Sequence, residues 1–152
     1  MRNSLEKIDI AIILFLRKIV PPLARVALFA VFFWFGFLKL FDTSPAGPLV
    51  AELLGKTLPF ITYRGFIVCF GLYEMLVGIS FLIPGLERLA IALLMPHMIT
   101  TFMPLVLLPS ITWKGFFTPT LEGQYIIKNL VIIALAFSIA ARLKPLKVKN
   151  NT

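Results

Sequence analysis

The sequence predicts an all-α integral membrane protein in which four transmembrane helices form a bundle. Hydrophobic residues make up 59% of the 152-residue chain, whereas ordinary soluble domains contain about 45–50%. Four segments approach the roughly 20 apolar residues needed to cross a hydrocarbon core of about 30 Å. Since the chain has no room for a separate soluble domain, residues 1–152 are expected to form a single membrane domain.

The N-terminal segment, residues 5–20, is expected to form a short helix at the membrane interface. Its apolar run, IAIILFL, follows Asp9 and is followed by Arg17-Lys18, and no small-residue cleavage site comes after it. A signal peptide is therefore not indicated. Pro21-Pro22 is expected to break this helix from the first span.

The boundaries of the spans come from loop signals between the apolar segments. DTSPAGP follows the first segment, Pro84-Gly85 the second and Pro109-Ser110 the third. Within the third segment, Pro96 and Pro104 are expected to bend the helix or leave carbonyl groups exposed. The spans are expected at about residues 23–41, 65–83, 89–108 and 121–141.

The basic residues are distributed unequally between the two ends of the spans. Three lie in the connections expected outside (Lys56, Arg64 and Lys114) and two lie inside spans (Lys39 and Lys128). The other ten are Arg2, Lys7, Arg17, Lys18, Arg25, Arg88, Arg142, Lys144, Lys147 and Lys149. By the positive-inside rule, both termini are expected in the cytoplasm of a bacterium, with the chain multi-pass in its inner membrane.

The net charge of +8 would suggest a nucleic-acid partner in a soluble protein. Here the basic ends are topology signals that also attract anionic lipid head groups, so the expected partner is the lipid bilayer and not nucleic acid.

The residue inventory excludes several kinds of chemistry. Cys69 is the single cysteine, which rules out an intrachain C-x-x-C pair. His97 is the single histidine and cannot supply two haem ligands or a histidine cluster for a metal. No phosphate-binding loop or nucleophile elbow occurs. We therefore expect no metal, no covalently bound cofactor and no intrinsic catalysis, so a redox role needs a diffusible cofactor or a partner oxidoreductase.

Glu74 lies inside the second expected span, in the sequence GLYEMLVGISFLIP. A carboxylate at the centre of a transmembrane helix costs about 2.5–3.5 kcal/mol on an insertion scale. At 100° per residue, Gly71, Glu74 and Gly78 share one helix face, and glycines allow a neighbouring helix to approach closely. Glu74 is therefore expected to face protein, with Gly36, Gly71 and Gly78 serving helix packing.

The partner of Glu74 is predicted from heights along the spans. At 1.5 Å per residue, Glu74 lies about 13 Å from the cytoplasmic end, Lys128 about 20 Å and Lys39 about 24 Å. Lys128 is therefore the expected partner and Lys39 the second choice. Gln124 and Asn129 would complete the network. Such a pair is either a functional site or a structural pair that fixes helix register.

His97 is expected near the middle of the third span, beside the break at Pro96. A histidine at this position is either a hydrogen-bonded core residue or a proton relay or quinone contact.

Four sequence pieces, taken together, resemble DoxX-like membrane proteins, especially their YkgB type. They are ARVALFAVFFWFGFLKLF, YEMLVGISFLIPG, the basic turn at Arg88 and GQYIIKNLVII, and they span about residues 24–141. The resemblance implies a four-helix inner-membrane protein. The positions that match the family pattern are Arg25, Gly36, Lys39, Glu74, Gly78, Lys128 and Asn129.

DoxX-like relatives include small subunits linked to quinone-reducing sulfur oxidation, membrane partners in oxidative-stress defence and assembly factors, and the YkgB type is associated with reactive-chlorine stress. This chain departs from that type in its shorter external connection, 42–64, and its short basic tail.

The resemblance implies a small non-catalytic subunit in redox or oxidant-stress defence that binds a quinone or another apolar ligand near Glu74 and Lys128. A membrane or cytoplasmic oxidoreductase would be its partner. Two alternatives remain. The chain is an interaction or assembly protein with a purely structural polar centre, or it is a small transporter, which would have to form homo-oligomers.

Overall fold

The computed structural model of the protein describes residues 4–145, which are mainly helical. Arg2, Lys147 and Lys149 of the basic ends lie outside the described residues. The elements, in chain order, are α1 (Ser4–Leu40), α2 (Gly47–Thr57), α3 (Tyr63–Leu82), α4 (Glu87–Phe102), α5 (Pro104–Leu107), α6 (Pro109–Thr112), β1 (Trp113–Gly115), β2 (Thr118–Pro119) and α7 (Leu121–Ala140).

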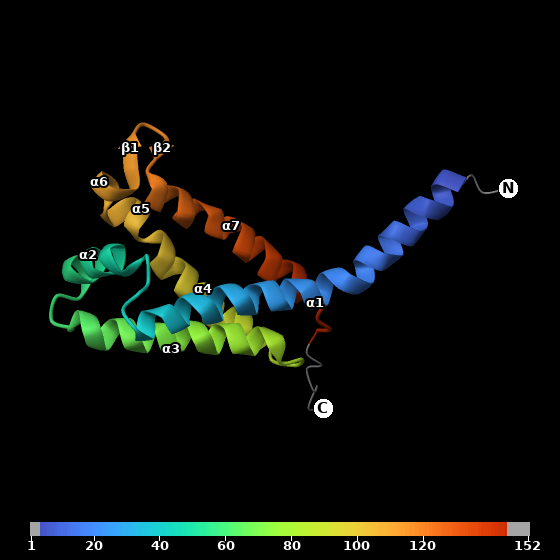
Figure 1. Ribbon diagram of the computed structural model, residues 1–152, viewed down its shortest axis with the longest axis horizontal. Coiled ribbons are helices and arrows are strands. Elements are labelled where there is room, and N and C mark those ends of the chain that lie inside the picture. The colour runs from blue at the N-terminus through green and yellow to red at the C-terminus, as the bar shows by residue number, and fades with distance from the viewer. Residues whose placement is uncertain (1–3, 146–152) are drawn as a thin grey trace, which may run out of the picture.

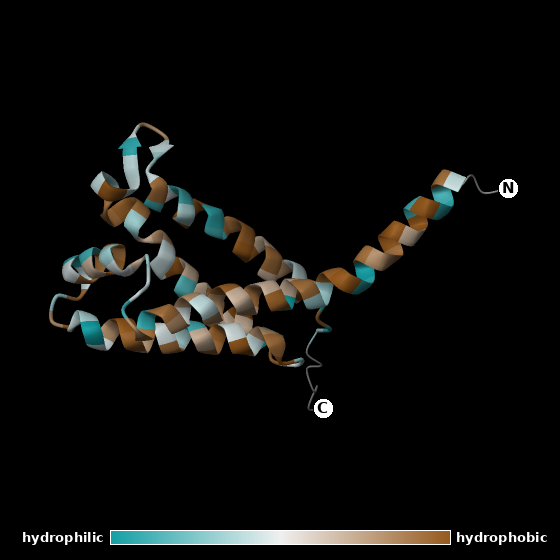
Figure 2. Cartoon of the chain, viewed as in Figure 1, coloured by the Kyte–Doolittle hydropathy of each residue, from teal (hydrophilic) through white to brown (hydrophobic). Residues whose placement is uncertain are grey.

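Four helices of the described chain are long and apolar enough to cross a membrane, which confirms that part of the prediction. They are α1, α3, the segment Glu87–Leu107 that joins α4 to α5, and α7. Helix α1 lies along α3, while α4 contacts both α3 and α7 (Figure 1). Figure 2 shows that these helices are mostly apolar along their length.

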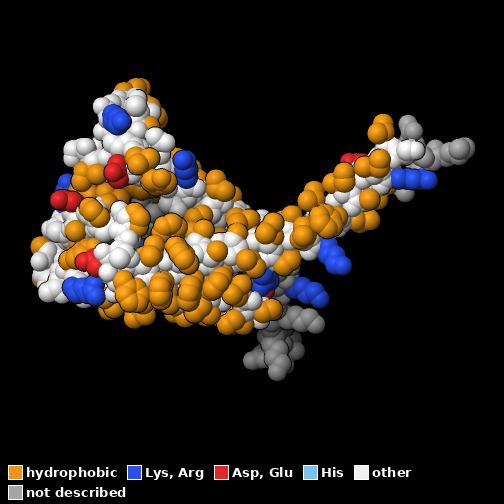
Figure 3. Space-filling model, viewed as in Figure 1, with side chains coloured by type: hydrophobic (Ala, Val, Ile, Leu, Met, Phe, Trp, Pro, Cys, Tyr) orange, Lys and Arg blue, Asp and Glu red, His pale blue; other side chains and the backbone are white. Residues whose placement is uncertain are grey.

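All four long helices contribute to the bundle core. Leu28 and Phe32 come from α1, Phe81 from α3, Leu94 from α4 and Ala136 from α7, and all are buried. The outer faces of the same helices carry exposed large apolar side chains (Figure 3). A bundle whose outside is as apolar as its inside is typical of proteins that lie in lipid.

The N-terminal helix differs from the prediction. Pro21 and Pro22 do not end it but lie inside the continuous α1, so the expected break between an interfacial helix and the first span is wrong. Each proline removes one backbone hydrogen bond and bends a helix without having to end it. Figure 1 shows the result: residues 4–20, here called the N-terminal arm, project away from the bundle.

The third span contains the two prolines identified in the sequence, and it is interrupted at the second. Pro96 lies inside α4, whereas Pro104 starts the separate short helix α5. One turn before Pro96, the Tyr73 hydroxyl donates a hydrogen bond of 2.6 Å to the carbonyl oxygen of Leu93. A side chain of α3 thus bonds the backbone of α4 close to Pro96.

The connections at the end of the bundle opposite the arm contain structure that the sequence did not indicate. Helix α2 lies within the 42–64 connection, and β1 and β2 form a two-stranded antiparallel hairpin between α6 and α7. The Thr120 hydroxyl caps α7 by accepting the N–H of Gly123 at 3.1 Å and donates to the carbonyl oxygen of Ile111 at 2.7 Å. The hairpin is therefore anchored to the start of the last long helix.

Candidate functional site

Three glycines bring α1 and α3 into backbone contact. A Cβ built at Gly71 would lie 2.6 Å from the carbonyl oxygen of Gly36, and a Cβ at Gly36 would lie 2.6 Å from that of Gly71. A Cβ at Gly78 would lie 2.9 Å from the backbone nitrogen of Phe33. Real Cβ atoms do not approach backbone so closely, so the crossing requires glycine at these positions.

This close crossing places Lys39 beside Glu74. A Cβ at Gly71 would lie 2.9 Å from the Cβ of Lys39, and one at Gly36 would lie 3.0 Å from the Cβ of Glu74. Lys39 Nζ donates a hydrogen bond of 2.5 Å to Glu74 Oε2, and both side chains are buried. Because neither charge has access to water, each depends on the other for its stabilisation.

His97 of α4 completes the group, and we call Lys39, Glu74 and His97 the polar triad. Nε2 of His97 lies 2.8 Å from the second carboxylate oxygen of Glu74, and the His97 side chain is buried. Its ring is stacked on Phe70, with centroids 5.1 Å apart, and is roughly perpendicular to the Phe32 ring, with centroids 5.3 Å apart. The triad therefore joins α1, α3 and α4, and aromatic side chains pack around its histidine.

Thr101 connects the imidazole to the backbone. Its hydroxyl oxygen lies 3.2 Å from His97 Nδ1 and 2.9 Å from the carbonyl oxygen of His97. For a neutral imidazole, Nε2–H donates to Glu74 and Nδ1 accepts from the hydroxyl. For a protonated one, Nδ1–H donates to the hydroxyl oxygen, and the hydroxyl proton turns to the carbonyl. Both states leave every hydrogen-bonding group of His97 satisfied.

Lys128, the expected partner of Glu74, lies elsewhere, and that prediction is wrong. It is exposed on α7, with Nζ 5.6 Å from the centroid of the Tyr125 ring. Gln124 is also exposed, and the Asn129 amide donates to the carbonyl oxygen of Tyr125 in its own helix. The buried positions of α7 are Gly123, Ile126, Ala136 and Ile139.

Gln124 and Lys128 therefore lie off the face of α7 that packs on the bundle, whereas Asn129 is half-buried and uses its amide within its own helix. The structure brings Lys39, Glu74 and His97 together and leaves Gln124, Lys128 and Asn129 outside the group.

The exposure of Lys128 leads to a first prediction. Replacing Lys128 with Met should change the free energy of unfolding by no more than about 0.5 kcal/mol, the usual range for surface positions without special contacts. Thermal unfolding in detergent measures this. A loss of about 3–5 kcal/mol, the cost of breaking a buried ion pair from one side, would show that Lys128 belongs to a structural charge pair.

A second ion pair joins α1 to α4 at the end of the bundle near the arm. Arg25 Nη2 donates to one carboxylate oxygen of Glu87, and the other accepts the N–H of Gly85 at 2.9 Å. The sequence indicated Arg25 as a topology signal and as a position that matches the family pattern, but it did not indicate Glu87.

Thr101 was also missed, although its place four residues after His97 puts it on the same helix face. Among residues 4–145, no group of three or more His, Cys, Asp or Glu side chains is arranged to hold a metal ion.

No family model matches the chain, and no curated protein or solved structure matches it.

Proposed function

We propose that this chain is a small multi-pass subunit of the bacterial inner membrane that serves redox or oxidant-stress defence. In this proposal the polar triad is the functional site. The resemblance to DoxX-like proteins of the YkgB type supports the proposed location and the role in stress defence. Buried ionisable side chains inside a membrane bundle are rare and mark functional sites by default, which supports the polar triad as the functional site.

Both termini face the cytoplasm in this proposal, as the excess of basic residues at one end of the spans indicates. Helix α1 has 37 residues and is about 55 Å long at 1.5 Å per residue, whereas the hydrocarbon core is about 30 Å thick. The arm therefore extends beyond the core, and its bend at the proline pair allows it to lie along the cytoplasmic interface.

The observation that carries the proposal is the hydrogen bonding of His97. Its imidazole lies between the Glu74 carboxylate and the Thr101 hydroxyl and is satisfied in both protonation states. With Lys39 charged, the triad is neutral when His97 is neutral and carries one positive charge when His97 is protonated. A buried imidazole whose hydrogen bonds can be formed in either protonation state is suited to proton transfer.

The expected ligand is a quinone or another apolar molecule with a carbonyl oxygen. When bound, a quinone supplies a two-electron, two-proton acceptor, and its electrons come from a partner oxidoreductase. The residues fit it chemically, because an ammonium has three N–H donors and Lys39 uses one, for Glu74, among the described residues. Lys39 would donate a hydrogen bond to the ligand oxygen, and His97 would exchange a proton with the ligand. The burial of the triad requires the ligand to enter between helices and not through an open cleft.

A second candidate is an interaction or assembly protein in which the triad only holds the bundle together. Both carboxylate oxygens of Glu74 are engaged within the chain, and the glycine contacts fix the same crossing. A single polar group can serve such a purpose by specifying helix register.

Replacing His97 with Gln distinguishes between the two candidate functions. Glutamine keeps an N–H donor for Glu74 but cannot be protonated. If the triad transfers protons, this variant should fail to protect a deletion strain from hypochlorous acid, with survival close to that of the empty vector. A purely structural triad would leave protection at the wild-type level, and that result would contradict the proposal.

Thr100→Ala serves as the matched control. Among the described residues, the Thr100 hydroxyl bonds only the carbonyl oxygen of His97, so its loss should not reduce protection. Extraction of bound cofactors from the gently purified protein tests whether the ligand is a quinone. A stoichiometric amount of quinone supports that assignment, whereas an empty protein that co-purifies with a membrane partner favours the assembly function.

A further inference from the structure

A cavity of about 220 Å³ lies at the base of the N-terminal arm. It is bounded by the proline bend of α1, the start of α4 and the end of α7, and its polar lining consists of Arg25, Glu87, Ser138 and Arg142. At about 30 Å³ per molecule in the liquid, its volume equals that of roughly seven waters. The cavity can therefore hold a polar head group.

One nitrogen of Arg25 has no partner in this cavity wall. Nη2 donates to Glu87, but Nη1 is buried and makes no hydrogen bond among the described residues. A buried charged donor without an acceptor is costly, and a guanidinium is shaped to bind a second oxygen-bearing anion. The N–H groups of Arg25 Nη1 are therefore available to donate to an anion in the cavity.

The charge balance of the lining also favours an anion. Glu87 carries the one negative charge, and its two oxygens already accept hydrogen bonds from Arg25 and Gly85. Arg142 adds a second guanidinium, so the lining has one net positive charge. The Ser138 hydroxyl donates to the carbonyl oxygen of Leu135 and so adds no charge to the lining.

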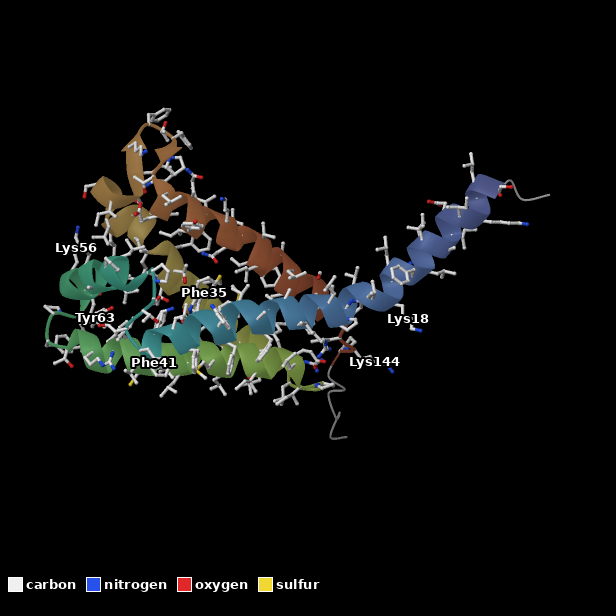
Figure 4. All side chains as sticks on the ribbon, viewed as in Figure 1. Lys18, Phe35, Phe41, Lys56, Tyr63 and Lys144 are labelled. Carbon is white, nitrogen blue, oxygen red and sulfur yellow. The ribbon has the colours of Figure 1, made fainter. Side chains whose placement is uncertain are left out.

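The remaining walls are apolar, which distinguishes this cavity from a site for a free ion. Val20, Ala24, Ile139 and Leu143 line it, and Leu23 beside them is 60% exposed. Figure 3 shows basic side chains where the arm leaves the bundle, and Figure 4 labels Lys18 and Lys144 at this end. Arginines above apolar walls at the end of a span match an amphiphile with an anionic head group.

We infer that this cavity binds the phosphate of an anionic phospholipid, with Arg25 Nη1 and Arg142 as its donors and the apolar walls contacting its glycerol and first acyl carbons. The bound lipid would fill the space between the base of the arm and α7. This inference is independent of the function proposed for the polar triad.

The test measures binding of dioctanoyl phosphatidylglycerol to the purified full-length protein in detergent, by its effect on the melting temperature. Phosphatidylglycerol should raise the melting temperature in a saturable way, and phosphatidylcholine of the same chain length should not. Arg142→Gln should weaken the apparent Kd by about tenfold or more, as expected for loss of a charge-assisted hydrogen bond. Arg142 is exposed, so its replacement should leave the melting temperature without lipid unchanged.

Lys18→Gln is the matched control, because it removes one exposed positive charge from the arm outside the cavity. Its apparent Kd should stay within about twofold of wild type. Equal weakening by both variants, or equal effects of the two lipids, would overturn the inference in favour of general charge attraction. Displacement of the lipid by inorganic phosphate at equal concentration would overturn the lipid assignment and leave a site for free phosphate.

Discussion

Replacement of Glu74 with Gln is expected to lower the free energy of unfolding by about 3–5 kcal/mol. The substitution leaves the buried Lys39 ammonium without its counter-ion, and breaking a buried pair from one side costs this much. For a chain of this size, the corresponding fall in melting temperature is about 6–20 °C. Thermal unfolding in detergent is the measurement.

Glu52→Gln provides a control for the Glu74 variant. Glu52 is exposed on α2, so the same change of side chain should have an effect within about 0.5 kcal/mol. Equal melting temperatures for the Glu74 variant and wild type would mean that the Glu74 carboxylate makes no net contribution to the bundle.

Replacement of Gly71 with Ala should have an effect of similar size for a different reason. The new Cβ would lie 2.6 Å from the carbonyl oxygen of Gly36. A backbone atom cannot rotate away as a side chain can, so α1 and α3 must separate, which also pulls Lys39 from Glu74. We expect a loss of about 3 kcal/mol, the upper end of the usual range for overpacking, measured by the same thermal unfolding.

Gly55→Ala is the matched control for the Gly71 variant. Gly55 lies inside α2, and a Cβ there meets nothing within 4 Å. Because alanine favours helix over glycine, this variant should gain about 0.5–1 kcal/mol. A Gly71→Ala protein as stable as Gly55→Ala would contradict the close crossing of α1 and α3.

The four long helices could be predicted from the sequence because their signal is simple. An apolar run of about 20 residues ended by Pro-Gly or Pro-Ser determines a span almost without tertiary information. The effect of the proline pair in α1 was predicted wrongly because it does depend on tertiary contacts. Whether Pro21 and Pro22 end a helix or only bend it depends on what the flanking turns contact, and no local pattern records this.

Helix α2 and the hairpin were missed because they are short and depend on contacts from elsewhere in the chain. Lys56 of α2 donates to the carbonyl oxygen of Leu107, and Thr120 bonds both α6 and α7. Such bonds join residues that are far apart or in different elements. Hydrophobic periodicity contains no information about them.

The candidate site shows what a helix pattern can and cannot specify. The glycines at positions 71 and 78 indicated a protein-facing Glu74, because they depend only on the face of one helix. The partner depended on how two helices are placed relative to each other. Heights counted from estimated span ends favoured Lys128. The contact between Gly36 and Gly71 instead places Lys39 beside Glu74, and the packing of α7 turns Lys128 outward.

The most direct test of the central claim, that Glu74 is held by Lys39 in the bundle interior, is a double-mutant cycle on thermal unfolding. Lys39→Met, Glu74→Gln and their combination form one cycle, and the same Glu74 variant with Lys128→Met forms the comparison. The Lys39 and Glu74 double variant should recover much of the single losses, since it buries no lone charge, with a coupling energy at the upper end of the roughly 0.5–3 kcal/mol seen for contacting residues. The Lys128 cycle should be additive. Additive losses for Lys39 and Glu74, together with coupling between Lys128 and Glu74, would contradict the account.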